Sequence, residues 1–425
     1  MKIQTLALMT ALSLTGPAQA QEGTLPARRA AAAERPSDVA AQLAYGRALI
    51  EAGHLDQAEK QMDKAVRASG GDIETLFEAV RVKFAGGNYK RVRAACRELK
   101  KKDPDHVLTH VCMARAFLVW RRASRALPEV EQAIAAAPNN YEALLAQGDA
   151  RRMRGDFEGA KASYQKALSV NPKGGDAYLG IGLLHLVRHQ RPEALAALGK
   201  ALQVAGDDPD VQFELGRAML DDGQAEGALR LLAKAAAGRP DWEQAKLYHS
   251  IALLKSGNAK EAEAALLAYL KRHPDHPVAT AQLGGALVAL GKYERAEQVL
   301  QKALVLSPND FDTAFSLARL FEKTGRSEEA FTQYRAAADL DRESPRPLIE
   351  AARLGVSLQR PMLASALVEK ALERAPRSAA ALAIYGDALL ARGERAAAKE
   401  RYQQALKGEG PVDRARIKKQ LDALK

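Results

Sequence analysis

The chain has 425 residues with 47% hydrophobic and only 5% aromatic content, two cysteines and a formal net charge of +11. This composition is too apolar for a disordered chain, and two cysteines are too few for a disulfide framework or a four-cysteine zinc site. At about 150 residues per domain the length alone predicts two or three globular units, and the basic excess first suggests a nucleic-acid partner.

Residues 1–20 have the pattern of a signal peptide. Lys2 gives a positive start, a short apolar segment follows, and Ala18 to Ala20 form a small-residue cleavage site. The alternative is a membrane anchor, but the segment is shorter than the roughly 18 apolar residues that a spanning helix needs. We therefore expect export to the periplasm with cleavage after Ala20, and no transmembrane segment in the mature chain. Residues 21–38 are expected to be an N-terminal leader, and an exported chain does not meet nucleic acid.

A 34-residue period runs through residues 39–412. With Val39 as position 1, the frame restarts at residues 73, 107, 141, 175, 209, 243, 277, 311, 345 and 379. Across the eleven copies, position 8 is small in ten, position 20 is alanine in ten and position 27 is alanine in nine. Position 15 is glycine in eight copies and position 32 is proline in seven. Such a period predicts a stack of small structural repeats instead of separate globular units.

Each repeat is expected to form two antiparallel helices. Small residues at positions 8 and 20 allow the helices to approach closely, glycine at position 15 ends the first helix, and proline at position 32 ends the second. Such a hairpin buries its apolar face only against its neighbours. Where Arg121, His189 and Gln359 replace the turn glycine, we expect distorted turns. Residues 413–425 are expected to form a C-terminal capping helix.

These residues resemble the tetratricopeptide repeat family, most clearly in the copies at residues 141–174 and 277–310. The resemblance implies an all-α fold, a right-handed α-solenoid of about eleven helix–turn–helix repeats. It also implies that the first helix of each repeat lines a concave face. Because the shared residues are packing residues, the resemblance is informative about the fold and weak about the function.

The two cysteines, Cys96 and Cys112, lie 16 residues apart on helices that we expect to be neighbours. An exported chain enters an oxidising compartment in which they could pair. The pattern favours two small apolar core residues, with a disulfide as the alternative.

The sequence carries no recognisable catalytic or metal-binding motif. The histidine pairs His106/His110 and His185/His189 have the spacing of one helix face, but neither has a zinc-protease glutamate or a third ligand nearby. Serine-hydrolase and nucleotide-binding motifs are also missing. We therefore expect no enzyme, no catalytic residues, no metal and no cofactor.

The positions that line the concave face in the family predict a candidate groove. Position 5 is apolar in all eleven copies, so the carboxylate clamp of lysine and asparagine that some members use is absent. Position 9 is arginine in six copies. Two interpretations stand equally: a groove for an amphipathic segment with acidic residues, or core positions with arginines that cover apolar surface. The candidate groove residues are Phe77, Phe84, Leu118, Phe213, Arg217, Leu247, Phe315, Arg319 and Arg353.

The positive charge is concentrated in residues 81–125, which hold thirteen basic residues and three acidic ones. The rest of the mature chain is electrically neutral. A focused charge favours an anionic partner, although a solvated basic face is the simpler interpretation. The candidate residues of this basic patch are Arg81, Arg91, Arg93, Arg97, Arg115, Trp120, Arg121, Arg122 and Arg125.

Together these features predict a non-enzymatic periplasmic scaffold that mediates protein–protein interactions in a cell-envelope assembly. The resemblance implies polysaccharide secretion, outer-membrane assembly, pili or gliding motility as settings. The expected partners are envelope proteins with acidic or amphipathic segments. The alternative is a binder of an anionic glycan or peptidoglycan through the patch at residues 81–125.

Overall fold

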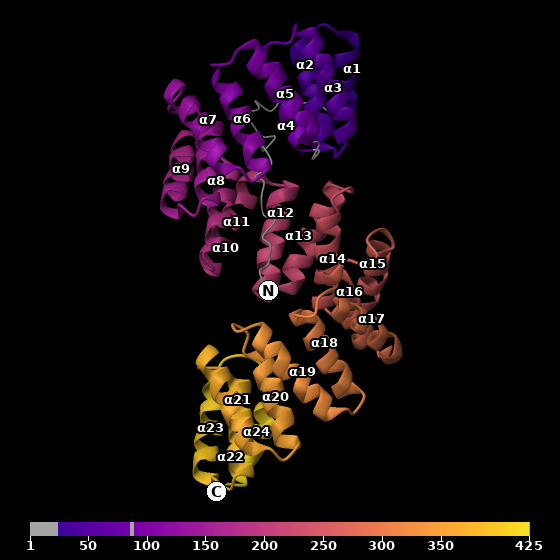
Figure 1. Cartoon of the computed structure of the whole chain (residues 1–425), viewed down its shortest axis with the longest axis vertical. Coiled ribbons are helices and arrows are strands. Elements are labelled where there is room, and N and C mark those ends of the chain that lie inside the picture. The colour runs from indigo at the N-terminus through magenta and orange to yellow at the C-terminus, as the bar shows by residue number, and fades with distance from the viewer. Residues whose placement is uncertain (1–23, 86–88, 425) are drawn as a thin grey trace. The chain divides into compact units, whose positions relative to one another are not determined.

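The structure is a computed structural model that describes residues 24–85 and 89–424 (Figure 1). The expected signal peptide at residues 1–20 lies outside these residues. Contacts divide the chain into two compact units, residues 24–252 and residues 253–424, with the division inside helix α14.

The first unit contains fourteen helices among its described residues. They are α1 (Leu25–Glu34), α2 (Val39–Glu51), α3 (Leu55–Ala68), α4 (Ile73–Ala85), α5 (Tyr89–Lys102), α6 (Val107–Val119), α7 (Ala123–Ala136), α8 (Tyr141–Met153), α9 (Phe157–Val170), α10 (Gly175–Val187), α11 (Arg191–Ala205), α12 (Pro209–Asp221), α13 (Ala225–Gly238) and α14 (Glu243–Lys255), which continues into the second unit.

The second unit continues the same alternation. Its described helices are α15 (Ala259–Arg272), α16 (Pro277–Ala289), α17 (Tyr293–Leu306), α18 (Phe311–Lys323), α19 (Ser327–Leu340), α20 (Arg346–Ser357), α21 (Pro361–Arg374), α22 (Ala379–Ala391), α23 (Arg395–Lys407) and α24 (Arg414–Asp422). Eleven hairpins, α2–α3 through α22–α23, follow one another, and α24 closes the series. The expected all-α solenoid is confirmed.

Helix α1 precedes the first hairpin, in the segment expected to be a leader. Its residue Ala32 is buried, and the Ala32 carbonyl accepts a hydrogen bond of 2.6 Å from the side chain of Gln42 in α2. The same amide donates to the carbonyl of Arg35 at 3.2 Å. Residues 25–34 therefore pack as part of the first unit.

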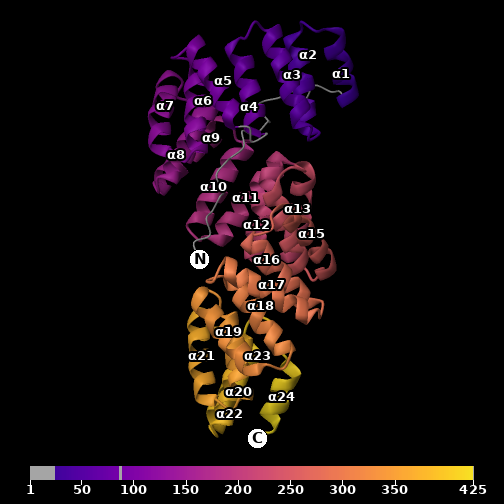
Figure 2. The ribbon, with the colours of Figure 1, turned by 45° about the vertical axis from the view of Figure 1, so that its right-hand side comes forward.

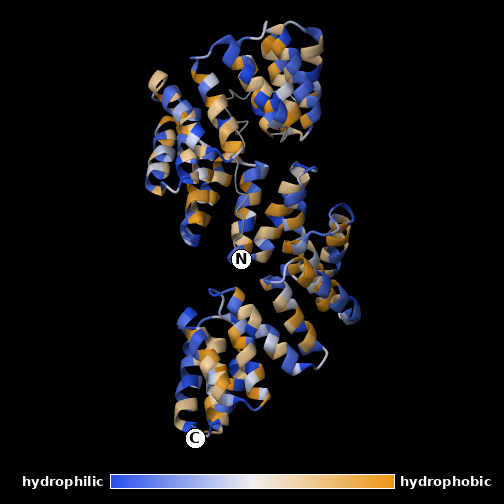
Figure 3. Cartoon of the chain, in the orientation of Figure 1, coloured by the Kyte–Doolittle hydropathy of each residue, from blue (hydrophilic) through white to orange (hydrophobic). Residues whose placement is uncertain are grey.

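Within each unit, the first helices of neighbouring hairpins pack on one another, as α4 does on α6 and α16 on α18 (Figure 2). In the described part of the chain, second helices show no comparable packing on each other. The first helices therefore lie on the inner side of each unit's curvature and the second helices on its outer side. Hydrophobic residues gather where helices face each other, and hydrophilic residues cover the outward faces (Figure 3).

Position 8 is small because the second helix of the same hairpin approaches it closely. In α8, Gly148 packs against the ring of the buried Tyr164, and in α10, Gly182 packs against Leu198. A Cβ atom added at Gly182 would lie 2.6 Å from Cγ of Leu198. The expected role of the small residues is thus visible as contact between the two helices.

Replacing Gly182 with alanine should lower the free energy of unfolding by about 1 to 3 kcal/mol, because the added methyl group overlaps Leu198. Gly199 in α11 is the matched control, since a Cβ added there meets nothing within 4 Å. Alanine is favoured over glycine inside a helix by about 1 kcal/mol, so Gly199→Ala should stabilise the chain. Denaturant titration measures both variants, and a loss of equal size in the two would contradict the close approach at Gly182.

The turns without glycine are not distorted, so that expectation is wrong. Arg121, His189 and Gln359 all have a φ of 57°, in the left-handed region that the seven described glycines at the equivalent position occupy. The hydrogen bonds are also kept, with the His189 amide donating to Leu186 and the next amide donating to His185. Neighbouring packing evidently holds the turn even where an L-residue is unfavourable.

His189→Gly and Gln359→Gly should each raise the free energy of unfolding by about 1 kcal/mol, because glycine removes the cost of the left-handed conformation. Gly155→Ala makes the reverse change at a turn where an added Cβ meets nothing within 4 Å, and it should destabilise by a similar amount. Midpoints of urea denaturation give the comparison. A loss of stability in both glycine variants would show that the histidine and glutamine side chains support these turns.

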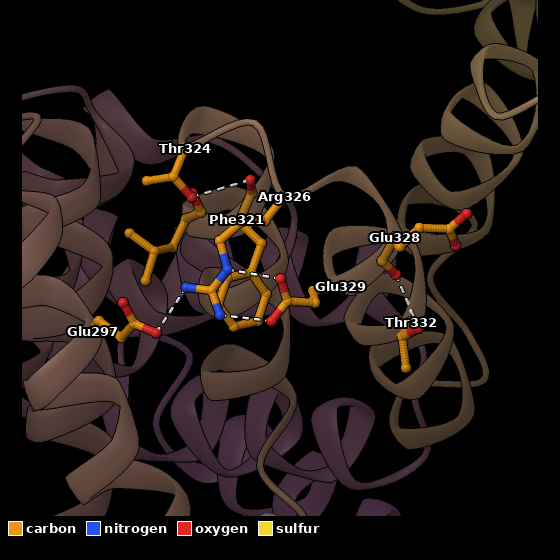
Figure 4. A network of polar contacts seen from close by, with 8 residues as sticks. Glu297, Phe321, Thr324, Arg326, Glu328, Glu329 and Thr332 are labelled. Carbon is orange, nitrogen blue, oxygen red and sulfur yellow. Dashed lines mark hydrogen bonds and ion pairs between the residues drawn. The ribbon is translucent and has the colours of Figure 1, made fainter.

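Ion pairs on the surface join successive hairpins. Arg326, between α18 and α19, donates two hydrogen bonds to Glu329 at 2.7 and 2.6 Å and a third to Glu297 of the preceding hairpin at 2.9 Å (Figure 4). Its guanidinium lies 4.1 Å from the ring centre of Phe321. One hairpin earlier, Lys292 pairs with Glu263 at 2.6 Å. Exposed pairs of this kind contribute little energy each, so apolar packing remains the main stabilisation.

Candidate functional site

The apolar candidate groove residues lie mainly in the core. Phe213 is 2% exposed, and its ring lies 4.5 Å from Trp242 and 5.4 Å from Tyr248. Phe315 is half-buried, 5.4 Å from the ring of Tyr334. The remaining apolar members of the set are also buried: Phe77, Phe84, Leu118 and Leu247. Their burial favours the interpretation of these residues as core residues.

The groove arginines are mostly neutralised by nearby glutamates. Arg217 is buried and bonds Glu214, three residues before it, at 2.6 Å. Arg353 bonds Glu350 at 2.9 Å and also Glu322 of the preceding hairpin. Arg319 is half-buried. Most of the positive charge expected along the groove is therefore compensated by glutamates of the same chain.

The candidate basic patch separates into a buried part and an exposed part. Arg81 in α4 is 6% exposed and bonds Glu78 at 3.0 Å, while Arg115 in α6 is 5% exposed and bonds Glu142 at 2.5 Å. These two arginines belong to first helices, on the inner side, and do not contribute to an outer surface. The exposed members lie on α5, on the turn after α6 and on α7: Arg91, Arg93, Arg97, Trp120, Arg121, Arg122 and Arg125.

Two exposed or half-exposed cations at the margins of this region are already paired. Arg91 bonds Glu59 of α3 at 2.8 Å, and Lys100 lies 3.8 Å from Glu129 of α7. Glu129 also bonds His110 at 2.7 Å. These contacts join α5 to the second helices on either side of it and engage Glu59 and Glu129.

The other cations have no such partner. Among the residues that the structure describes, Arg97, Lys101, Arg121, Arg122 and Arg125 form no ion pair. Arg93 contacts the ring of Trp120, whose centre is 5.9 Å from the guanidinium carbon, and Trp120 itself is 39% exposed. We call these seven residues the outer basic surface: Arg93, Arg97, Lys101, Trp120, Arg121, Arg122 and Arg125.

Lys101 is the member that was not singled out from the sequence. Arg93, Arg97 and Lys101 follow one another at four-residue spacing, which places them along one face of α5. At 1.5 Å per residue the row is about 12 Å long, with about 6 Å between neighbours. The spacing itself was the signal that could have identified Lys101.

Cys96 of α5 and Cys112 of α6 are joined by a disulfide, which corrects the expectation of two unlinked core residues. Both cysteines are fully buried, and their Cα atoms are 5.6 Å apart. The spacing in sequence does not reveal that the two side chains face each other across the contact between consecutive hairpins. The bond therefore joins α5, which carries the row of cations, covalently to α6.

The histidines serve local structure. His106 caps α6 by accepting a hydrogen bond from the amide of Leu108 at 3.2 Å, and His185 bonds the side chain of Gln190 at 2.8 Å. Within residues 24–85 and 89–424, no cluster of three or more histidine, cysteine or acidic side chains is placed to hold a metal ion. None of the helices in these ranges has the length and apolar character needed to cross a bilayer.

Comparison with protein-family models identifies the family. Two family models, both described as tetratricopeptide repeat, match the chain and together cover more than half of it. One matches residues 25–73, 113–168, 249–311 and 282–345, and the other matches residues 151–212 and 188–248. A search of the curated proteins finds no match.

Several solved structures are similar to the chain at low identity. Yeast Tom70 is 14% identical, with 92% of this chain and 96% of that chain covered and a TM-score of 0.47. The APC/C hetero-tetramer Cut9–Hcn1 is 16% identical, with 85% and 78% covered and a TM-score of 0.46. YrrB, described as a TPR protein with an unusual peptide-binding site, is 23% identical, with 43% and 95% covered and a TM-score of 0.40.

Proposed function

This chain belongs to the tetratricopeptide repeat family, and we propose that it is an exported scaffold that holds protein partners together in a cell-envelope assembly. Proteins of this family mediate protein–protein interactions and are typically non-enzymatic scaffolds. The proposed settings are polysaccharide secretion, outer-membrane assembly, pili or gliding motility.

The observation that carries the proposal is the contrast between the two faces of the first unit. On the inner side, apolar side chains are packed, and Arg81, Arg115 and Arg217 are paired with glutamates. On the outer side, five cations form no ion pair among the described residues, and an exposed tryptophan, Trp120, contacts Arg93. Tryptophan and arginine are the residues that most often dominate the energy of protein interfaces. We therefore assign partner binding to the outer side.

Export is supported by the sequence of residues 1–20, and an oxidising compartment is compatible with the Cys96–Cys112 disulfide. Fractionation of the producing cells, followed by mass spectrometry of the chain's N-terminus, tests this part. We expect a periplasmic protein that begins at Gln21. A cytoplasmic protein that retains Met1 would contradict it.

A second candidate function is binding of an anionic glycan or peptidoglycan, which the exposed Trp120 beside several arginines also favours. Chemical crosslinking in intact cells, followed by purification of the chain, separates the two functions. A scaffold should yield adducts of discrete mass that glycan-degrading enzymes leave intact. Adducts that these enzymes reduce to the mass of the chain alone would favour the glycan.

A further inference from the structure

We propose that the outer basic surface binds an acidic helical segment of a partner protein. The carboxylates of that segment would align with Arg93, Arg97 and Lys101, and an apolar side chain would cover Trp120. The inference rests on the proposed scaffold function and specifies both where the partner binds and which chemistry it presents.

The charges of this surface are available to a partner. On the neighbouring second helices, Glu59 is engaged with Arg91, and Glu129 is engaged with His110 and Lys100. On α5 itself, Glu98 is the only acidic residue, and Asp103 caps the turn after the helix. A surface with this excess attracts a segment of opposite charge and fixes its register.

The spacing of the cations matches a helix. Carboxylates four residues apart on a helix lie about 6 Å apart along its axis, which equals the spacing of the row on α5. Arginine can hold a carboxylate through two parallel hydrogen bonds, so Arg93 and Arg97 suit glutamate or aspartate side chains. Arg121, Arg122 and Arg125 lie beyond Trp120 and extend the positive surface toward α7.

The surface is held in place before a partner arrives. The Cys96–Cys112 disulfide joins α5 to α6, and the Arg93–Trp120 contact links α5 to the end of α6. A rigid surface loses less conformational entropy on binding than a mobile one. A helix that is already ordered within a folded partner also loses little conformational entropy on binding.

Fluorescence anisotropy with two synthetic peptides of about six helical turns tests the inference. The aligned peptide carries glutamates at four-residue spacing on one face with a leucine beside them, and the scrambled peptide has the same composition spread around the helix. Binding to the full chain is compared with binding to the triple variant Arg93→Glu/Arg97→Glu/Lys101→Glu. The control variant is Arg414→Glu/Lys418→Glu/Lys419→Glu, which reverses three exposed cations on α24.

We expect the aligned peptide to bind the full chain and the α24 control equally, and to lose about tenfold or more in affinity for the α5 variant. Trp120→Ala should weaken binding by a similar factor, while Met362→Ala, which removes a side chain that is 65% exposed on α21, should not. The scrambled peptide should bind more weakly than the aligned one. Circular dichroism and thermal unfolding verify that the variants remain folded.

Equal affinity for the two peptides, or no loss in the α5 variant, would overturn the inference. Alginate and vesicles of phosphatidylglycerol and phosphatidylcholine serve as competitors. Tighter binding of either competitor, with the same loss of affinity in the α5 variant, would assign the surface to that polyanion instead.

Crosslinking in cells distinguishes failure of this inference from failure of the proposed function. If the α5 variant still forms all protein adducts in cells, the scaffold function stands and only the assignment of the partner to the outer basic surface is wrong. If the unmodified chain forms none, the scaffold function itself fails.

Discussion

Asp149→Ala should lower the free energy of unfolding by about 3 kcal/mol or more, because it leaves a buried arginine without its counter-charge. Arg152 is 8% exposed, and its guanidinium lies 3.2 Å from the Asp149 carboxylate. Tyr164 completes the cluster by donating a hydrogen bond of 2.7 Å to the same carboxylate, and its hydroxyl accepts one of 3.3 Å from Arg152. Burial, reinforced by Asp149, raises the pKa of Tyr164, so its hydroxyl stays protonated and keeps donating. Guanidinium denaturation of the purified chain measures the loss.

The matched control is Asp387→Ala in the last hairpin. Asp387 occupies the same repeat position, accepts a hydrogen bond of 2.8 Å from Tyr402 and pairs with Arg416 at 2.9 Å. The Arg416 side chain is 39% exposed, so water can replace its partner and the loss should be about 1 kcal/mol. Tyr164→Phe should likewise cost about 1 kcal/mol, since it removes only the hydroxyl. Equal losses at Asp149 and Asp387 would contradict the role of burial.

Removal of the Cys96–Cys112 disulfide should lower the stability of the second and third hairpins by about 3 kcal/mol. A cross-link that closes a loop of about 16 residues restricts the unfolded chain by about that amount. Because each hairpin contacts only its neighbours, the loss should be local. Hydrogen exchange of α5 and α6 should accelerate in Cys96→Ala/Cys112→Ala and in the reduced chain, while exchange in residues 253–424 should not change.

Alkylation of the denatured, unreduced chain gives the control for this prediction. Two protected thiols are expected for protein from an oxidising compartment, and two alkylated thiols would show that the bond is absent there. Ala126→Gly in α7 is a comparison variant, because Ala126 is also a buried residue of the third hairpin but lies in a core cluster that contains neither cysteine. We expect faster hydrogen exchange centred on α7 in that variant. In the cysteine variant we expect the faster exchange to be centred on α5 and α6. Unchanged exchange in α5 and α6 after reduction would contradict the stabilising role of the bond.

The fold was predictable because its determinants are local and repeated. A small residue at position 8 and alanine at position 20 mark the helix contact in nearly every copy, and Gly182 against Leu198 shows why. The turn at His189 was mispredicted because the left-handed conformation costs an L-residue only about 1 kcal/mol, which the packing of the flanking helices overcomes.

The candidate site was less predictable because exposure and pairing depend on neighbouring hairpins. Position 5 reads as apolar in the sequence whether it lines a groove or packs on rings such as Trp242 and Tyr248. Arg217 could have been recognised as paired, since Glu214 precedes it by three residues on the same helix. Arg115 could not, because its partner Glu142 belongs to the next hairpin.

Photo-crosslinking in living cells tests most directly whether partners bind the outer side. In one variant, a photoreactive phenylalanine derivative replaces Ala94, which is exposed on α5 and lies between Arg93 and Arg97 in the sequence. In a second variant it replaces Arg319, which is half-buried on α18, the first helix of its hairpin. We expect protein adducts from position 94 that the Arg93→Glu/Arg97→Glu/Lys101→Glu changes abolish, and none from position 319. Adducts from position 319 alone would place binding on the inner side and contradict the account.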